Sequence, residues 1–276
     1  MIQEDLMVIL PEQSPYSKII CPPLGQRVPK PRNRGITMVI DKGLGKNSFI
    51  DLMETAGQYV DILKFGFGSC LLYPENVLRH KLMSARLHSV ITCTGGTFSE
   101  IALHQNQFES MVEKSLELGF AAIEISDGTM TLDRATREAA IRRVSKEGIA
   151  ISEVGKKLDA FPPAADIVAQ IDADLNAGAQ FVIMEGRESG ENVGIYKDRG
   201  TLDEQLLDEL VKRLSQDSLK RIIWEAPKKA QQTALIQRFG TNVNLGNVAP
   251  DEALAVECLR QGLRSDTFVA ALLRKK

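Results

Sequence analysis

The sequence has few of the side chains from which zinc, redox and nucleophilic sites are usually built. It holds only three histidines, which fall in predicted helices or in the turn before a strand: His80, His88 and His104. The sequence therefore offers few side chains for a zinc site or a histidine-based catalytic triad. Its four cysteines are scattered without a C-x-x-C pair, which suggests no disulfide framework and indicates reduced thiols: Cys21, Cys70, Cys93 and Cys258. Cys93 ends a predicted strand, but with no histidine to activate it we interpret it as a small buried residue.

Two further absences narrow the class of protein. Aromatic residues make up 5% of the chain, which gives bases no stacking platform, and 34 basic against 36 acidic residues leave a net charge of -2. We therefore expect no nucleic-acid partner. No apolar run approaches the roughly 18 residues of a membrane span, and the N-terminus lacks the order of a signal peptide. We expect a cytoplasmic protein without a membrane partner.

The remaining composition is that of an ordinary globular chain, with 43% hydrophobic and 25% charged residues among 276. Residues 1–34 differ from the rest, because they have no sustained hydrophobic period and carry many prolines: Pro11, Pro15, Pro22, Pro23, Pro29 and Pro31. We interpret this segment as an N-terminal arm that contributes little to the fold.

Residues 35–276 alternate short β-branched runs with longer helix-like segments, which predicts a parallel sheet. Eight such runs are present: Thr37–Asp41, Val60–Gly66, Ser89–Thr94, Ala121–Ser126, Ala150–Val154, Phe181–Glu185, Arg221–Glu225 and Val243–Leu245. A doubly wound dinucleotide-binding sheet would need G-x-G-x-x-G after its first strand, and Gly43-Leu44-Gly45 lacks that spacing. The predicted fold is a single α/β domain, a (β/α)8 TIM-type barrel.

Charged residues gather at the ends of five predicted strands, and the carboxyl ends of barrel strands form the catalytic face: Lys64, Glu124, Glu153, Glu185 and Glu225. Side chains alternate along a strand, so Ile123 and Ile125 packed on the helices would turn Glu124 toward the barrel axis. A ring of carboxylates and lysine suits a divalent cation bound beside an anionic substrate. The alternative is a set of polar loop starts or ion pairs, such as Lys64 with Glu124.

Three segments at or just after predicted strands are candidate anion sites. Their residues are Gly95 and Gly96, Arg187 and Ser189, and Asn244 and Gly246. The glycine pair precedes a predicted helix, whose N-terminus attracts anions. An arginine can bind a carboxylate or phosphate through two parallel hydrogen bonds, and the eighth strand is where barrels often hold phosphate. Plain turns, and a structural ion pair of Arg187 with Glu188 or Glu153, remain alternatives.

Nine segments in order, spread from Gly35 to Phe268, together resemble the phosphosulfolactate synthase family: Asp41–Leu44, Leu63–Gly68, Gly95–Thr97, Glu124–Gly128, Glu153–Lys157, Glu185–Gly190, Glu225–Pro227, Asn242–Leu245 and Gly262–Phe268. The resemblance implies a magnesium-dependent barrel enzyme that adds sulfite to phosphoenolpyruvate. The product would be (2R)-phospho-3-sulfolactate, the first intermediate of one route to coenzyme M. Small-molecule substrates and a homo-oligomer are the expected partners.

The resemblance also implies roles for individual residues. Lys157 would be the general acid that protonates C2 of the substrate, with Lys156 as the alternative. The candidate Mg²⁺ ligands are Glu124, Glu185 and Glu225, with Asp41 and Asp127 as further possibilities. Phosphate, carboxylate and sulfite would be bound by Arg187, Lys64 and Lys42.

Two other functions are compatible with the same sequence. A barrel aldolase would form a Schiff base on Lys64 or Lys156, and borohydride would trap it with substrate. A non-catalytic, stress-related relative of the same fold is the second alternative, although the chain retains Lys157, Glu124, Glu185 and Arg187.

Overall fold

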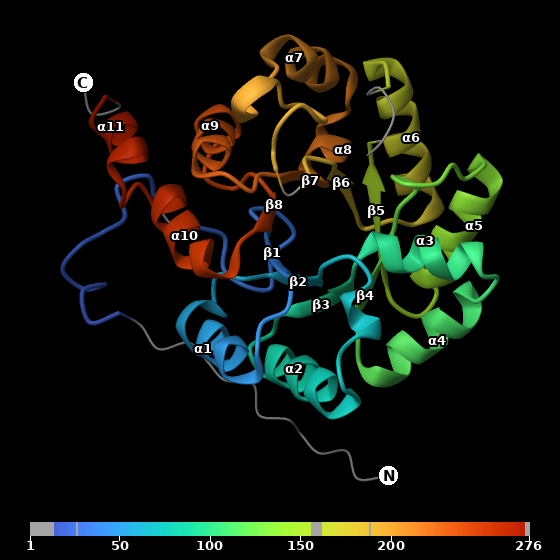
Figure 1. Ribbon diagram of the computed structural model, residues 1–276. Helices are drawn as coiled ribbons and strands as arrows, with labels where there is room; N and C mark the ends of the chain where they lie inside the picture. The colour runs from blue at the N-terminus through green and yellow to red at the C-terminus, as the bar shows by residue number, and fades with distance from the viewer. Residues whose placement is uncertain (1–13, 26, 156–161, 188, 274–276) are drawn as a thin grey trace.

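The computed structural model describes residues 14–25, 27–155, 162–187 and 189–273. Eight parallel strands follow one another in chain order around a closed barrel, and β8 pairs with β1 to complete it. Helices surround the strands on the outside (Figure 1). The predicted TIM-type barrel is therefore confirmed.

The strands are short and all but one overlap closely with the predicted runs. Their bounds are β1 (Thr37–Asp41), β2 (Ile62–Phe65), β3 (Ile91–Thr94), β4 (Ala122–Ile125), β5 (Ile149–Val154), β6 (Phe181–Met184), β7 (Ile222–Glu225) and β8 (Leu245–Val248). The last run is misplaced, because we expected a strand at Val243–Leu245 and β8 only begins at Leu245.

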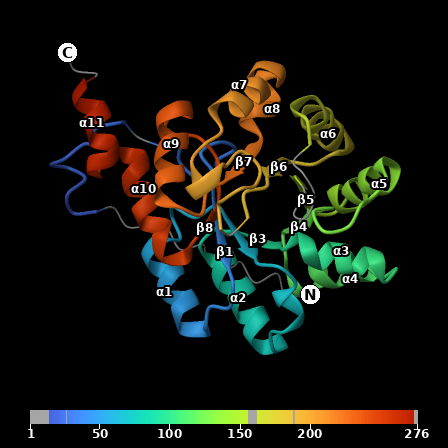
Figure 2. The same cartoon turned by 45° about the horizontal axis from the view of Figure 1, so that its top comes forward.

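The outer layer is formed by helices whose apolar stripes face the sheet, as in α1, where Phe49, Leu52 and Met53 are buried. The helices are α1 (Lys46–Ala56), α2 (Glu75–Leu87), α3 (Gly96–His104), α4 (Phe108–Leu118), α5 (Arg134–Ser145), α6 (Ala164–Ala177), α7 (Glu204–Arg213), α8 (Gln216–Lys220), α9 (Lys229–Phe239), α10 (Ala253–Gln261) and α11 (Ser265–Leu273). The tilted view shows them around the strands (Figure 2). Among the described helices, none has the length and apolarity needed to cross a bilayer.

The inside of the barrel is apolar over most of its depth. Inward-facing side chains form one buried cluster: Ile36, Met38, Ile62, Cys93, Ala122, Ile151, Phe181, Ile183 and Ile223. Cys93 is fully buried there, and this burial raises the pKa of its thiol well above the usual value, as expected of a small core residue rather than a nucleophile. The charged side chains of the strand ends lie one step further along the same inward faces.

The arm contributes more to the fold than we expected. Its described part contains no helix or strand, but Arg27 forms a 2.5 Å ion pair with Glu257 of α10, and Arg32 a 3.0 Å ion pair with Asp61 before β2. All four side chains are nearly inaccessible to solvent. In both views the segment runs beside α10 (Figures 1 and 2), and the Leu24 N–H donates to the Gln261 carbonyl. The described part of the arm therefore covers the amino ends of the strands.

Arg260 closes the seam between the first and last strands at this end. Its buried guanidinium donates to the carbonyl oxygens of Val243 (2.6 Å), Thr241 (2.8 Å) and Ile36 (3.0 Å), which precede β8 and β1. Methionine fills similar volume but donates nothing, so Arg260→Met should lower the free energy of unfolding by about 3–5 kcal/mol.

Urea denaturation measures this loss, and Arg213→Met is the matched control. Arg213 is half exposed and, among the described residues, pairs with Glu209 on its own helix, so its substitution should change stability by less than about 0.5 kcal/mol. Equal effects of the two substitutions would contradict a closing role for Arg260.

Candidate active site

Five charged side chains meet inside the barrel at the carboxyl ends of the strands: Lys64, Glu124, Glu153, Glu185 and Glu225, here called the charged ring. Lys64 Nζ lies 3.3 Å from Glu124 Oε2 and 3.0 Å from Glu225 Oε1. Since β2, β4 and β7 are not neighbours in the sheet, their side chains can meet only in the interior. Ile123 and Ile125 pack in a separate outer cluster, which confirms that Glu124 faces the axis.

Lys64 is the cation of this ring. Burial by itself lowers its pKa, but the carboxylates of Glu124, Glu225 and Glu153 outweigh burial and hold the pKa of Lys64 well above its usual value. The side chain is therefore protonated and carries a fixed positive charge. A protonated amine is a poor nucleophile, which disfavours Lys64 as a Schiff-base residue.

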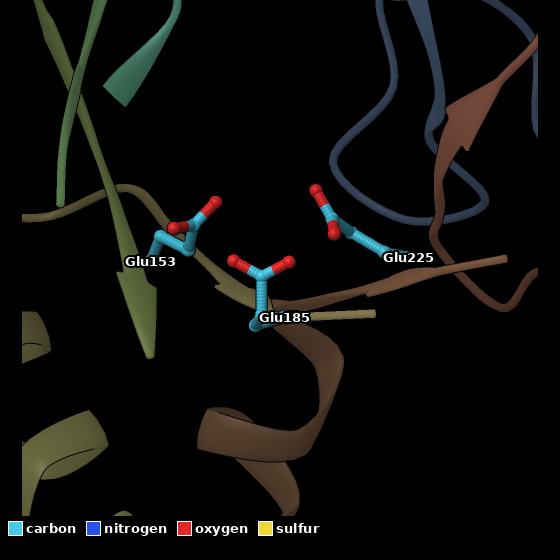
Figure 3. Close-up of side chains that lie close together, drawn as sticks. All are labelled: Glu153, Glu185 and Glu225. Atoms are coloured by element: carbon cyan, nitrogen blue, oxygen red, sulfur yellow. The ribbon is translucent and has the colours of Figure 1, made fainter. Parts of the chain in front are cut away.

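Three of the four ring carboxylates converge on one point. Glu153, Glu185 and Glu225 each place an oxygen within 4.8 Å of the others, and all three are buried (Figure 3). We call these residues the carboxylate triad. Clustered carboxylate oxygens are the donors that hard divalent cations such as Mg²⁺ prefer. Glu185 and Glu225 were predicted as ligands, whereas Glu153 was assigned only to the ring.

Backbone N–H groups of the turn after β6 donate hydrogen bonds to this triad. The Gly186 N–H donates to Glu225 Oε2 at 2.9 Å, and the Arg187 N–H donates to Glu185 Oε1 at 2.7 Å. Arg187 has a φ of 54°, a left-handed conformation that is costly for a residue other than glycine. Its buried Nε has no hydrogen-bond partner among the described residues. The backbone hydrogen bond to Glu185 thus holds the half-buried Arg187 beside the triad, with its Nε donor unused among the described residues.

The glycine pair at the start of α3 has a different role from the predicted one. The Gly96 N–H donates to Glu124 Oε1 at 2.9 Å, so the anion at this helix N-terminus is a glutamate of the protein itself. A Cβ at Gly96 would collide with Glu124, and one at Gly95 with the Phe67 backbone. Both positions require glycine because neighbouring atoms leave no room for a Cβ. Glu124 is thereby bound to the helix and to Lys64 and lies outside the carboxylate triad.

Comparison with known proteins decides the family. Residues 25–266 match the model of the (2R)-phospho-3-sulfolactate synthase (ComA) family. The chain belongs to this family. It is 44% identical over 243 residues to a phosphosulfolactate synthase of Methanothermobacter thermautotrophicus, covering 87% of this chain and 93% of that protein. It is 36% identical over 245 residues to a phosphosulfolactate synthase of Bacillus subtilis, covering 88% and 95%.

Two more distant matches were also found. The protein HEAT-STRESS-ASSOCIATED 32 of Arabidopsis thaliana is 26% identical over 263 residues, covering 85% of this chain and 88% of that protein. The chain is thus more similar to phosphosulfolactate synthases than to this stress-associated protein. A crystal structure of 3-hexulose-6-phosphate synthase superposes with a TM-score of 0.51 at 16% identity, covering 82% of this chain and 98% of that one. This likeness shows the barrel alone.

Two predicted ligands in this phosphosulfolactate synthase family member lie outside the triad. Asp41 is fully buried and pairs at 2.5 Å with Lys81 of α2, on the outer side of β1. Asp127 accepts from Arg137 at 2.9 Å, and Arg137 also binds Asp174 of α6 at 2.6 Å. Both aspartates therefore fasten helices to the barrel, and the structure does not bring them to the carboxylate triad.

Asn244 lies at the opposite end of the barrel from the charged ring. Its side chain accepts from the Ile36 N–H at 3.0 Å and donates to the carbonyls of Lys220 (2.8 Å) and Ile222 (2.9 Å), which precede or begin strands. The predicted substrate contact is corrected here, because β8 starts after Asn244 rather than around it. Asn244 joins the amino ends of three strands.

Gly246 faces the interior, where a Cβ would lie 2.9 Å from Met38 Cε and 3.0 Å from Ile223 Cγ2. Packing therefore explains its lack of a side chain. The next residue, Asn247, was not singled out from the sequence. It is 6% exposed, has a φ of 51° at a register shift between β8 and β1, and its Oδ1 has no partner among the described residues. Asparagine tolerates a positive φ better than most residues do, so an asparagine at this position was the sequence signal for a left-handed backbone conformation.

Two of the remaining predicted residues lie on loops. Lys42 is exposed after β1, and Ser189 is exposed after β6, where its Oγ accepts from the Glu191 N–H at 3.4 Å. Lys156 and Lys157 lie outside the described residues. Their predicted role as general acid therefore stays a prediction.

Proposed function

We propose that this protein is a phosphosulfolactate synthase that adds sulfite to phosphoenolpyruvate, giving (2R)-phospho-3-sulfolactate for coenzyme M synthesis. The buried charged ring is the observation that supports this most strongly. It combines a fixed cation, Lys64, with a carboxylate triad at the catalytic end of a barrel. Two relatives at 44% and 36% identity carry the name phosphosulfolactate synthase.

The reaction needs positive charge in one particular place. The sulfur lone pair of sulfite forms a bond to C3, and the electrons of the C2–C3 double bond move to C2 and into the carboxylate. C2 then accepts a proton to complete the addition. Because negative charge develops on the carboxylate during this sequence, cationic groups already fixed beside it lower the barrier. Protonated Lys64 is one such group, and Arg187, with its spare donor, suits the phosphate or carboxylate.

We propose Mg²⁺ as the cofactor, held by Glu153, Glu185 and Glu225. Among the described residues of the ring, four carboxylates face one lysine, and buried negative charge is costly without a compensating cation. Oxygen donors within 4.8 Å of one another fit a hard cation. When bound, such an ion supplies further positive charge to the substrate carboxylate. Lys157 is the proposed proton donor to C2, with Lys156 as the alternative.

The test is direct. Incubation of the protein with sulfite, phosphoenolpyruvate and Mg²⁺ should yield phosphosulfolactate by mass spectrometry, and EDTA should abolish its formation. Borohydride added with substrate should trap no adduct. Absence of product under all conditions would instead support the non-catalytic relative, and a trapped lysine adduct would support the aldolase.

We also propose that the enzyme acts in the cytoplasm as a homo-oligomer. Helix α11 supports an interface, because Phe268, Val269 and Leu272 are between 42% and 54% exposed on it. Light scattering coupled to size-exclusion chromatography should give a mass that is a multiple of 30.4 kDa. A monomer at micromolar concentration would contradict this proposal.

A further inference from the structure

A buried glutamate on α3 lies directly behind the charged ring. Glu100 is 4% exposed, and its Oε2 accepts from the backbone N–H groups of Thr129 and Met130, both at 3.0 Å. These two residues belong to the loop that follows β4. Its other oxygen, Oε1, lies 2.9 Å from the Ser126 hydroxyl. Burying a carboxylate is costly, so a position with this many polar contacts needs an explanation.

Ser126 connects Glu100 to the carboxylate triad. Its fully buried Oγ lies 2.9 Å from Glu100 Oε1 and also 2.9 Å from Glu153 Oε1. The Gly128 N–H donates to the same Oγ at 3.1 Å. A continuous set of hydrogen-bonding atoms therefore runs from α3, through the end of β4, to Glu153 on β5.

The same helix contacts a second ring carboxylate. The Gly96 N–H holds Glu124 Oε1, and the Ser99 hydroxyl donates to the Glu124 carbonyl oxygen at 2.5 Å. Helix α3 thus reaches the ring at two points, directly at Glu124 and through Ser126 at Glu153. A merely structural helix would need only its apolar stripe against the sheet.

We propose that Glu100 is a positioning residue that acts through Ser126 to orient Glu153 in the carboxylate triad. This inference rests on the proposed function, because it assigns Glu153 to a cation site. Glu100 fixes the loop after β4 through two backbone N–H groups, and its Oε1 shares the single proton of the Ser126 hydroxyl with Glu153 Oε1. A carboxylate held in this way presents its second oxygen in one direction, as outer hydrogen-bond partners do for metal ligands elsewhere.

The test measures binding of Mn²⁺ alone by electron paramagnetic resonance, in the full-length protein without substrate. Ser126→Ala and Glu100→Ala should each weaken Mn²⁺ binding by about 10- to 100-fold and lower kcat, with the KM for phosphoenolpyruvate changed only a few fold. Glu100→Gln should bind Mn²⁺ within about threefold of the wild type. Its amide oxygen can accept from Thr129 and Met130, and its NH₂ group can donate to Ser126 Oγ, which leaves the Ser126 proton for Glu153.

Ser145→Ala and Glu117→Ala are matched controls, since both side chains are exposed and neither approaches the ring. Unchanged Mn²⁺ affinity in Ser126→Ala and Glu100→Ala, with binding lost in Glu153→Gln, overturns the positioning role and leaves the cation site intact. A Glu100→Gln variant as defective as Glu100→Ala also overturns it. Absence of Mn²⁺ binding in the wild type removes the cation site itself, and the inference falls with it.

Discussion

Replacing Glu225 by glutamine should lower kcat by about 10²- to 10³-fold and raise the Mg²⁺ concentration needed for activity by about 10- to 100-fold. Glu225 has three tasks. One oxygen accepts from Lys64, the other accepts from the Gly186 N–H, and the carboxylate belongs to the triad. An amide fails at one of them in either orientation, because its NH₂ group meets another donor at Lys64 or at Gly186.

Steady-state rates at increasing Mg²⁺ measure both effects, and circular dichroism checks that the variant is folded. Glu75→Gln is the control, since Glu75 is exposed on α2 and forms its ion pair with Arg79 of the same helix. A Glu225→Gln enzyme with wild-type rates at ordinary Mg²⁺ would remove this residue from the active site.

Substitution of Lys157 by alanine should lower kcat by about 10²- to 10⁴-fold and leave the KM for phosphoenolpyruvate within a few fold. The reason is timing: a general acid acts only after sulfite has attacked. Lys157→Arg keeps the charge, but its pKa above about 12 leaves it unable to release the proton, so this variant should also stay slow.

The pattern across variants separates protonation from binding. If Lys157 only holds phosphate, KM should rise and Lys157→Arg should recover activity. Lys156→Ala is the neighbouring control, and a loss of kcat confined to it would move the acid one residue back along the chain. A normal kcat in Lys157→Ala is incompatible with the proposed general acid.

The barrel and the inward direction of Glu124 follow from the sequence pattern. Eight separated runs predicted the strands, and alternation around Glu124 predicted its inward direction. The boundary of β8 was missed because Gly246 and Asn247 are typical turn residues. In the structure Gly246 is required by crowding inside the barrel, and Asn247 takes a left-handed conformation at a register shift.

The interaction partners of the charged side chains were harder to predict from the sequence than the direction in which a side chain points. Parallel strands are apolar on both faces, so the sequence around Asp41 does not show which side its carboxylate takes. The signal lay on α2, where Lys81 falls in the buried stripe formed by Leu78, Leu82 and Ala85. A lysine in such a stripe requires a buried anion, and Asp41 is that anion. The choice between Glu124 and Glu153 for the triad depends on side-chain conformations that no sequence pattern encodes.

The arm and Arg260 occupy the end of the barrel opposite the ring, and the apolar interior separates the two ends. The ion pairs of the arm and the chemistry of the charged ring therefore depend on different residues, with the apolar interior of the barrel between them. A lineage could lose or strengthen the ion pairs of Arg27 and Arg32 as its growth temperature changed, without touching the groups that handle sulfite. Directed evolution should find the same freedom: heat-tolerant variants should accumulate changes around the amino ends of the strands, while variants with new substrates should change the loops at the other end.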